Sequence, residues 1–221
     1  MKNFSSLKDS ALKTLENKWG QFVAITLVAY VIGSGIGFVP YVGTLLTLAV
    51  IPLGYGYSIA ILKNYRGGEI QLVDIFDAYK NTEVLGRVLL TLLLRGVYTF
   101  LWFLLLIVPG FIKSISYTMT EFVLNDNPDL KYDAAITRSS ELMNGHKWEF
   151  FLFSLSFIGW FLLSILTFGI GFLWSTPYYM SAKSAYYHGL LEDEANKESY
   201  GQDDYVKVLP TERFVQNNIH I

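Results

Sequence analysis

Residues 19–62 read WGQFVAITLVAYVIGSGIGFVPYVGTLLTLAVIPLGYGYSIAIL, 44 consecutive residues without a charged side chain. A helix needs about 20 apolar residues to cross a hydrocarbon core about 30 Å thick, so this run is long enough for two spans. Its middle, Gly37 to Gly43, holds Pro40 between two glycines, and these residue types end one helix and turn into the next. The run therefore predicts a membrane hairpin, with spans near 21–38 and 43–62.

Two further uncharged runs extend this pattern. The run of 33 residues from Phe150 to Ala182 divides at Thr167–Gly171 and predicts spans near 148–167 and 170–190. A third stretch, 86–108, meets Pro109-Gly110 and is followed by a shorter, more polar segment from Phe111 to about Leu124. The prediction is an all-α, polytopic membrane protein with about six segments in three hairpins. Structural turns or breaks are predicted at Pro40, Pro109, Gly110, Gly145, Gly169, Gly171 and Pro177.

The composition supports a membrane class and argues against several others. Of the 221 residues, 52% are hydrophobic and only 16% are charged, against about 25% charged in an ordinary soluble domain. The absence of cysteine excludes disulfides, thiol nucleophiles and thiolate metal sites. The three histidines are scattered, and the net charge of −2 gives no reason to expect nucleic acid as a partner. With no phosphate-binding loop, zinc-protease motif or catalytic constellation, we expect no enzyme, no metal and no cofactor.

The basic residues predict the orientation. If six segments are present, 14 of the 17 lysines and arginines lie on one face, and the turns near 39–42, 109–110 and 168–170 carry none. The positive-inside rule then places both termini in the cytoplasm.

An amphipathic segment precedes each hairpin, at residues 4–18, 70–80 and 128–144. Apolar side chains recur there at helical spacing, which predicts three cytoplasmic interfacial helices with their apolar faces toward the bilayer. The third is expected to be capped by Asn127 and to end at Gly145. Residues 1–191 form the predicted membrane domain. Residues 192–221, with seven acidic and three basic side chains, are expected to be a disordered cytoplasmic tail.

A few ionisable residues fall within or beside the predicted segments. Arg87, Arg95 and Lys113 are each within reach of a membrane surface, so snorkelling explains them. The alternative is a polar interior that binds an anion or a lipid headgroup. Glu121 is too far from Lys113 for a pair within one helix, so its partner is expected from another segment. The hydroxyl side chains near these ionisable residues are explained more simply as hydrogen-bonding links between helices than as parts of a binding site. The candidate ligand-binding residues are Arg95, Lys113, Glu121 and Lys183.

A family resemblance rests on ordered motifs. They include Ile107-Val-Pro-Gly-Phe-Ile-Lys113, Asn125-Asp-Asn-Pro128, Ser139-x-x-Leu-Met-x-Gly145, Leu155-Ser-Phe-Ile-Gly-Trp160 and Tyr186-Tyr187. In these the chain resembles the bacterial membrane family called domain of unknown function 975, most clearly over 100–190. A fainter similarity runs to the membrane portion of glycerophosphodiester phosphodiesterases, whose catalytic barrel is missing here. The resemblance implies a multi-pass protein of the bacterial cytoplasmic membrane without an assigned activity.

Two functional hypotheses remain open at this level. The first is a non-catalytic membrane protein that acts through protein or lipid contacts at its cytoplasmic face. The second is a small permease or a lipid- or anion-handling subunit that uses the four candidate residues. The bilayer is the expected partner of either, and membrane or cytoplasmic proteins are further candidates. The sequence indicates no oligomeric state.

Overall fold

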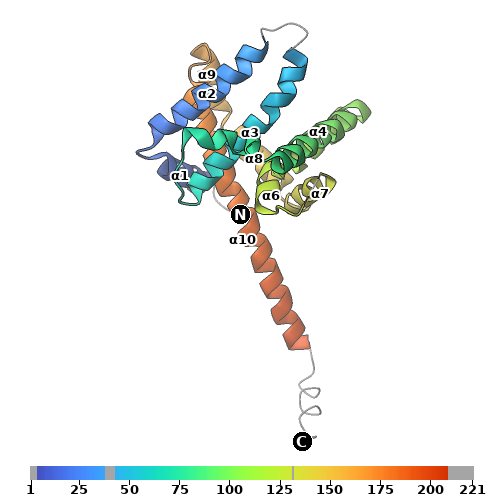
Figure 1. Ribbon diagram of the computed structural model, residues 1–221. Helices are drawn as coiled ribbons and strands as arrows, with labels where there is room; N and C mark the ends of the chain where they lie inside the picture. The colour runs from blue at the N-terminus through green and yellow to red at the C-terminus, as the bar shows by residue number, and fades with distance from the viewer. Residues whose placement is uncertain (1–3, 38–42, 131, 209–221) are drawn as a thin grey trace, which may run out of the picture.

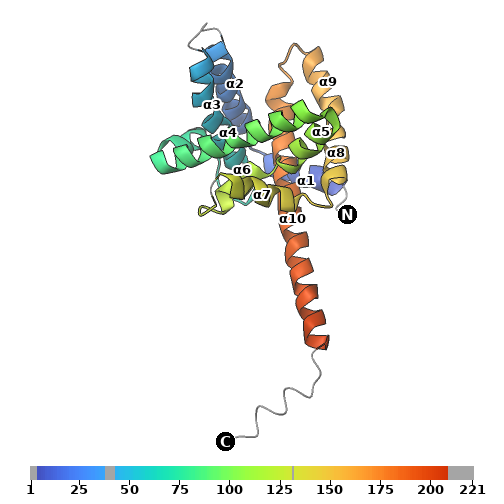
Figure 2. The ribbon, with the colours of Figure 1, turned by 90° about the vertical axis from the view of Figure 1, so that its right-hand side faces the viewer.

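The computed structural model describes residues 4–37, 43–130 and 132–208, which are helical with no strand. Figures 1 and 2 show a helical bundle from which the last helix projects. The helices are α1 (Phe4–Leu15), α2 (Trp19–Gly37), α3 (Gly43–Tyr65), η1 (Leu72–Tyr79), α4 (Thr82–Leu105), α5 (Ile107–Ser116), α6 (Thr120–Asp126), α7 (Asp133–Leu142), α8 (Lys147–Leu155), α9 (Ile158–Leu166) and α10 (Phe172–Val208).

The order of elements follows the predicted repeat of a short helix and a hairpin. α1 precedes the α2–α3 pair, η1 precedes α4 and α5–α6, and α7 precedes α8–α9 and α10. Two stretches of the described chain are long and apolar enough to cross a membrane, Thr82–Leu105 and Lys147–Leu166. The segment after α4 is divided into helices of 10 and 7 residues, each shorter than one membrane span.

The three short helices bury their apolar faces against the protein. In α1, Leu7, Ala11 and Leu15 are buried at the predicted spacing, and Lys8 Nζ donates to the carbonyl oxygen of Ser156 at 3.0 Å. In η1, which is a 3-10 helix, Ile75 and Ala78 are buried. The apolar faces therefore contribute to the core, whereas the sequence predicted that they would face lipid.

Helix α7 begins five residues later than predicted. Asn127 ends α6 instead of starting the next helix, because its side-chain amide donates to the carbonyl oxygen of Val123 at 2.9 Å. The apolar side of the helix that the spacing predicted is buried at Ala135, Ile136, Ser139 and Leu142, within the protein and not against lipid.

The predicted turns have several outcomes. Gly145 and Gly169 adopt φ of +83° and +89° after α7 and α9, which confirms both as turn residues. The chain turns between α4 and α5 at Leu106, so that Pro109 lies in the first turn of α5, where no backbone N–H is needed. Gly110 and Gly171 allow close approach, since an added Cβ would lie 2.6 Å from the Phe103 ring and 2.7 Å from Ser164 Cα. Pro177 lies inside α10, and Pro40 lies outside the described residues.

Helix α10 differs from the predicted C-terminal segment. It continues as a helix to Val208, in place of a disordered tail from residue 192, and projects beyond the bundle in both views (Figures 1 and 2). A side-chain pair fixes its path at the point of exit, since Arg138 Nη1 donates to Glu194 Oε1 at 2.8 Å. Residues 209–221 of the predicted tail lie outside the described residues.

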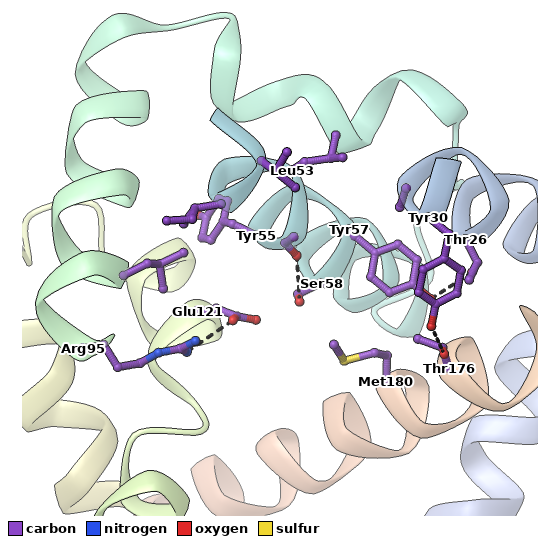
Figure 3. A pocket seen from close by; sticks show the side chains of 15 residues that line it. Thr26, Tyr30, Leu53, Tyr55, Tyr57, Ser58, Arg95, Glu121, Thr176 and Met180 are labelled. Atoms are coloured by element: carbon purple, nitrogen blue, oxygen red, sulfur yellow. Dashed lines mark hydrogen bonds and ion pairs between the residues drawn. The ribbon is translucent and has the colours of Figure 1, made fainter. Parts of the chain in front are cut away.

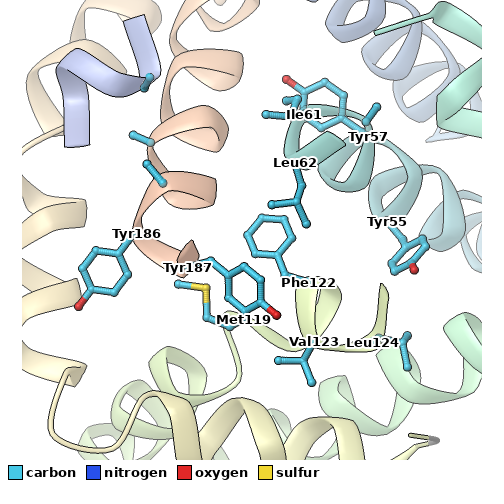
Figure 4. Packing of buried hydrophobic residues seen from close by; sticks show 14 of the residues in the cluster. Tyr55, Tyr57, Ile61, Leu62, Met119, Phe122, Val123, Leu124, Tyr186 and Tyr187 are labelled. Atoms are coloured by element: carbon cyan, nitrogen blue, oxygen red, sulfur yellow. The ribbon is translucent and has the colours of Figure 1, made fainter. Parts of the chain in front are cut away.

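Aromatic side chains make up much of the core at the meeting of α3, α6 and α10. Figure 4 shows Phe122 of α6 between Leu62 of α3 and Tyr187 of α10, and the Phe122 and Tyr187 ring centroids are 5.2 Å apart. Phe122 and Leu62 are each no more than 1% exposed. Such burial of large side chains is the main favourable term in packing the bundle where it excludes water.

An ion pair lies at one end of these helices. Arg66, directly after α3, donates from Nη1 and Nη2 to the two carboxylate oxygens of Asp126 at 2.7 and 2.5 Å, and the Tyr187 hydroxyl donates to Asp126 at 2.9 Å. Burial raises the pKa of Asp126, but the hydrogen bonds from Arg66 and Tyr187 outweigh burial and hold the pKa below its ordinary value of 3.8.

This ion pair predicts a loss of stability in acid. Because the pKa of Asp126 is lower in the folded state, its contribution is present above pH 3.8 and is lost as the pH falls through the folded-state pKa. The free energy of unfolding should therefore decrease between about pH 5 and about pH 3, and Asp126→Asn should make this decrease smaller. Asp129→Asn, at an exposed carboxylate, is the control and should leave the slope unchanged. Equal slopes in both variants would contradict the assignment. Urea unfolding of the detergent-solubilised protein measures the slopes.

Candidate functional site

Three helices distant in sequence bring charged side chains together inside the bundle. Arg95 comes from α4, Glu121 from α6 and Lys183 from α10. Arg95 Nη1 donates to Glu121 Oε1 at 3.2 Å, with side-chain exposures of 28% and 14%. Figure 3 shows the Arg95 side chain directed at the Glu121 carboxylate. The structure thus confirms that the partner of Glu121 comes from another segment, and Arg95 makes this contact within the bundle.

Lys183 is the most buried charged member of the group, with 6% of its surface exposed. Within the described part of the chain, its Nζ has no hydrogen bond or ion pair and lies 5.0 Å from the centre of the Phe122 ring. Glu121 attracts it electrostatically, and Arg95 repels it. The Nζ of Lys183 is not sealed off, so its three N–H donors are accessible to water or to a ligand.

The group carries a net charge of +1 when Arg95, Glu121 and Lys183 are all ionised. Glu121 neutralises one of the two cations, and its contact with Arg95 is a single hydrogen bond instead of a bidentate pair. Arg95 therefore keeps N–H donors beyond the one given to Glu121. Two cations with spare donors beside one carboxylate are the groups that an anion-binding site requires.

A cavity of about 260 Å³ adjoins these donors. Arg95, Glu121 and Lys183 all line it, together with hydroxyl-bearing side chains from α4 and the segment after it. Three of these hydroxyls donate to backbone carbonyl oxygens, which leaves the cations as the main donors of the wall. The hydroxyl residues are Thr99, Ser114, Tyr117 and Thr118.

A larger cavity of about 510 Å³ lies on the other side of the ion pair. Arg95 and Glu121 line it as well, and most of its remaining wall is apolar. Most of its hydroxyls hydrogen-bond within the protein: Tyr30 contacts Thr176 at 2.8 Å, and Thr26 contacts Tyr57 at 3.0 Å. Figure 3 shows α2, α3 and α10 enclosing this space, with Met180 of α10 on its wall.

Lys113 does not belong to this group. It lines neither cavity, and its Nζ lies 5.0 Å from the centre of the Trp102 ring, in a cation–π contact between α5 and α4. The structure therefore separates Lys113 from the other three predicted site residues. Arg87, which the sequence assigned to snorkelling, instead donates to the backbone carbonyl oxygens of Asn127 and Pro128.

The sequence identified three residues of the site and missed others. Lys183, one of the predicted candidates, is buried, and Glu121 attracts it electrostatically. The cavity walls from α2 and α3 were missed, because an uncharged run gives no signal of which face lines a cavity. Among the described residues, no three His, Asp or Glu side chains lie together in a way that would hold a metal ion.

The comparisons bear on the C-terminal half of the site. Nothing among the curated proteins or the solved structures matches the chain, so the similarity to glycerophosphodiester phosphodiesterases stays a prediction. Residues 103–194 match a family model described as "Protein of unknown function (DUF975)". The match includes Glu121 and Lys183 and begins after Arg95. It coincides with the stretch that carries the motifs quoted above, and it supports the resemblance of this segment to the DUF975 family.

Proposed function

We propose that the chain is a multi-pass protein of the bacterial cytoplasmic membrane, with six membrane segments and both termini in the cytoplasm. The two long apolar stretches support this proposal, because only 11% and 22% of their most apolar windows are buried in the protein. A core helix of a soluble protein would be mostly buried. Large side chains such as Leu104, Leu166 and Phe168 are 73%, 76% and 100% exposed, and lipid would cover them.

The distribution of ion pairs supports the orientation. Lys63–Asp74, Arg66–Asp126 and Arg138–Glu194 all involve the connections assigned to the cytoplasm. The turn between α9 and α10, residues 167–171, has no charged side chain. The proposed outer face is thus almost without charge, as the positive-inside rule requires.

Single cysteines introduced into this cysteine-free chain test the topology. Phe168→Cys, in the proposed outer turn, should react with a membrane-impermeant maleimide in intact protoplasts. Glu69→Cys, exposed between α3 and η1, should react only after the membrane is disrupted. The unmodified chain is the control and should not react at all, since it contains no cysteine. Equal labelling of the two variants in intact protoplasts would contradict the proposed orientation.

The function that the geometry supports best is binding of an anionic ligand within the membrane, without catalysis. Of the two hypotheses open at the sequence level, this is the lipid- or anion-handling one. The observation that carries it is Lys183, a buried ammonium group without a directed protein partner, beside a pair that already neutralises Glu121. Burying a net charge in a membrane protein is costly, and a bound anion would offset that cost.

Binding of inorganic phosphate by the purified protein tests this function. Lys183→Met removes the buried ammonium at similar volume and should weaken phosphate binding about tenfold or more, the loss expected for charge-assisted hydrogen bonds. Lys113→Met removes a cation outside the group and should leave the affinity unchanged. If phosphate does not bind, or binds equally to both variants, the proposed function is wrong.

A second candidate function rests on the projecting part of α10. This segment extends beyond the bundle on the proposed cytoplasmic side (Figure 2), where it is accessible to a protein partner. Co-purification in mild detergent tests the candidate. A partner that is lost when residues 195–221 are removed would support it, and a protein that is always recovered alone would count against it.

A further inference from the structure

The ion pair of Arg95 and Glu121 lies between two cavities of opposite character. The cavity of about 260 Å³ holds the donors of Lys183, and the cavity of about 510 Å³ is mainly apolar. Arg95 and Glu121 line both. A site with a charged end and an apolar end of this size suits a ligand that has the same two parts.

The larger cavity has little to offer a polar solute. Most of its hydroxyls already hydrogen-bond within the protein, at Thr26–Tyr57, Tyr30–Thr176 and from Ser58 to the carbonyl oxygen of Gly54, and the Tyr55 hydroxyl is the exception among the described residues. A polar ligand would leave its own donors and acceptors unsatisfied there. A hydrocarbon chain would instead contact the apolar side chains of the wall and remove them from water.

The charges of Arg95 and Lys183 determine which head group the ligand carries. Arg95 and the buried Lys183 would repel a cation, and a neutral group would leave the net positive charge of the site uncompensated. An anionic head placed at Arg95, within the smaller cavity, reaches both cations and supplies the acceptors that the protein does not.

We infer that the site binds an anionic amphiphile, with its acidic head on Arg95 and Lys183 and its hydrocarbon chain in the cavity between α2, α3 and α10. This inference rests on the proposed anion-binding function and specifies the ligand class. A carboxylate and a phosphate head satisfy the same donors. The ligand is therefore a fatty acid or a phosphate-bearing lipid, and the experiment below distinguishes these two.

The structure offers a separate variant for each end of the ligand. Lys183→Met removes a donor to the head. Ala29→Phe places a ring in the larger cavity, because Ala29 lines that cavity and not the smaller one. Ala24→Phe adds the same ring to an exposed position of α2 outside both cavities and serves as the matched control.

The test uses the full chain in nanodiscs of phosphatidylcholine, with native mass spectrometry to measure bound ligand. The probes are oleate, oleoyl lysophosphatidate, the neutral lipid monoolein and inorganic phosphate. At least one anionic amphiphile should bind more tightly than both monoolein and phosphate, and the tighter of the two identifies the head. Lys183→Met should weaken binding of that amphiphile about tenfold or more.

The variants at the two alanines test the hydrocarbon-chain end of the ligand separately from the anion-binding function on which this inference rests. Ala29→Phe should weaken amphiphile binding about tenfold and leave phosphate binding intact, which also shows that the variant is folded. Ala24→Phe should bind both as the unmodified chain does. If Ala29→Phe has no effect, or if the amphiphiles bind no more tightly than phosphate, the amphiphile is wrong and the anion site stands. If Lys183→Met binds every probe as the unmodified chain does, both are wrong.

Discussion

Replacing Gly56 by alanine is expected to destabilise the protein by about 3 kcal/mol, the upper range for a side chain forced into a packed site. An added Cβ would lie 2.1 Å from the carbonyl oxygen of Ile75 and 2.7 Å from its carbonyl carbon. Both are backbone atoms, so the clash is relieved only if η1 moves away from α3. Ile75 is fully buried, and moving it would disrupt the core beneath η1.

Gly54 provides the matched control for this prediction. It lies in the same helix two residues earlier, and an added Cβ there meets nothing within 4 Å. Alanine favours a helix interior over glycine by about 0.5–1 kcal/mol, so Gly54→Ala should be neutral or stabilising. Thermal unfolding of the two variants in detergent measures the difference. Equal unfolding temperatures would show that η1 does not pack on α3 as described.

Substitutions at Glu121 and Lys183 are expected to change stability in opposite directions. Glu121→Gln leaves the charges of Arg95 and Lys183 inside the bundle without a compensating anion and should destabilise the protein by about 3 kcal/mol. Lys183→Met leaves the Arg95–Glu121 pair electrically neutral and replaces a buried charge by an apolar side chain of similar size. The protein should then be more stable by about 1 kcal/mol.

Thermal unfolding without added anion tests this pair of predictions. Lys113→Met is the control, because it removes a cation that contacts the Trp102 ring outside the group. Its effect should be small, since a cation–π contact that is not desolvated contributes about 0.5–1 kcal/mol. Destabilisation by Lys183→Met equal to that by Glu121→Gln would mean that Lys183 serves as a structural ion-pair partner, and the argument for a ligand would fail.

The helix pattern could be predicted from the sequence because it depends on local features. Uncharged runs and their Pro and Gly breaks placed the hairpin α2–α3, the start of α8, the end of α9 and the start of α10 close to their observed positions. Spacing alone identified the buried faces of α1 and α7. These features depend on residues a few positions apart, so no knowledge of the tertiary contacts is needed.

What the sequence did not show depends on contacts between distant segments. Asn127 has the chemistry of a cap at either end of a helix, and only its bond to Val123 decides that it ends α6. The helical course of α10 past residue 192 accompanies the Arg138–Glu194 pair, which joins residues 56 positions apart. Composition alone favoured disorder there.

The candidate site was predicted in part for the same reason. Scarcity of charge in apolar segments singled out Arg95, Lys113, Glu121 and Lys183, and three of them do meet. Which three of the four residues would meet was not predictable. Lys113 and Glu121 are close in sequence but lie on different helices, α5 and α6. The cavities are products of packing among helices from across the chain, and no residue pattern indicates them.

The most direct test of a net-positive anion site is the rise in unfolding temperature that an anionic amphiphile produces in three proteins. A ligand stabilises the folded state in proportion to the logarithm of its concentration over its dissociation constant, so the rise reports affinity. Without its own carboxylate the site should bind an anion more tightly, and without its ammonium more weakly. The account predicts the largest rise for Glu121→Gln, an intermediate rise for the unmodified chain and the smallest for Lys183→Met. Equal rises in all three, or the reverse order, would contradict it.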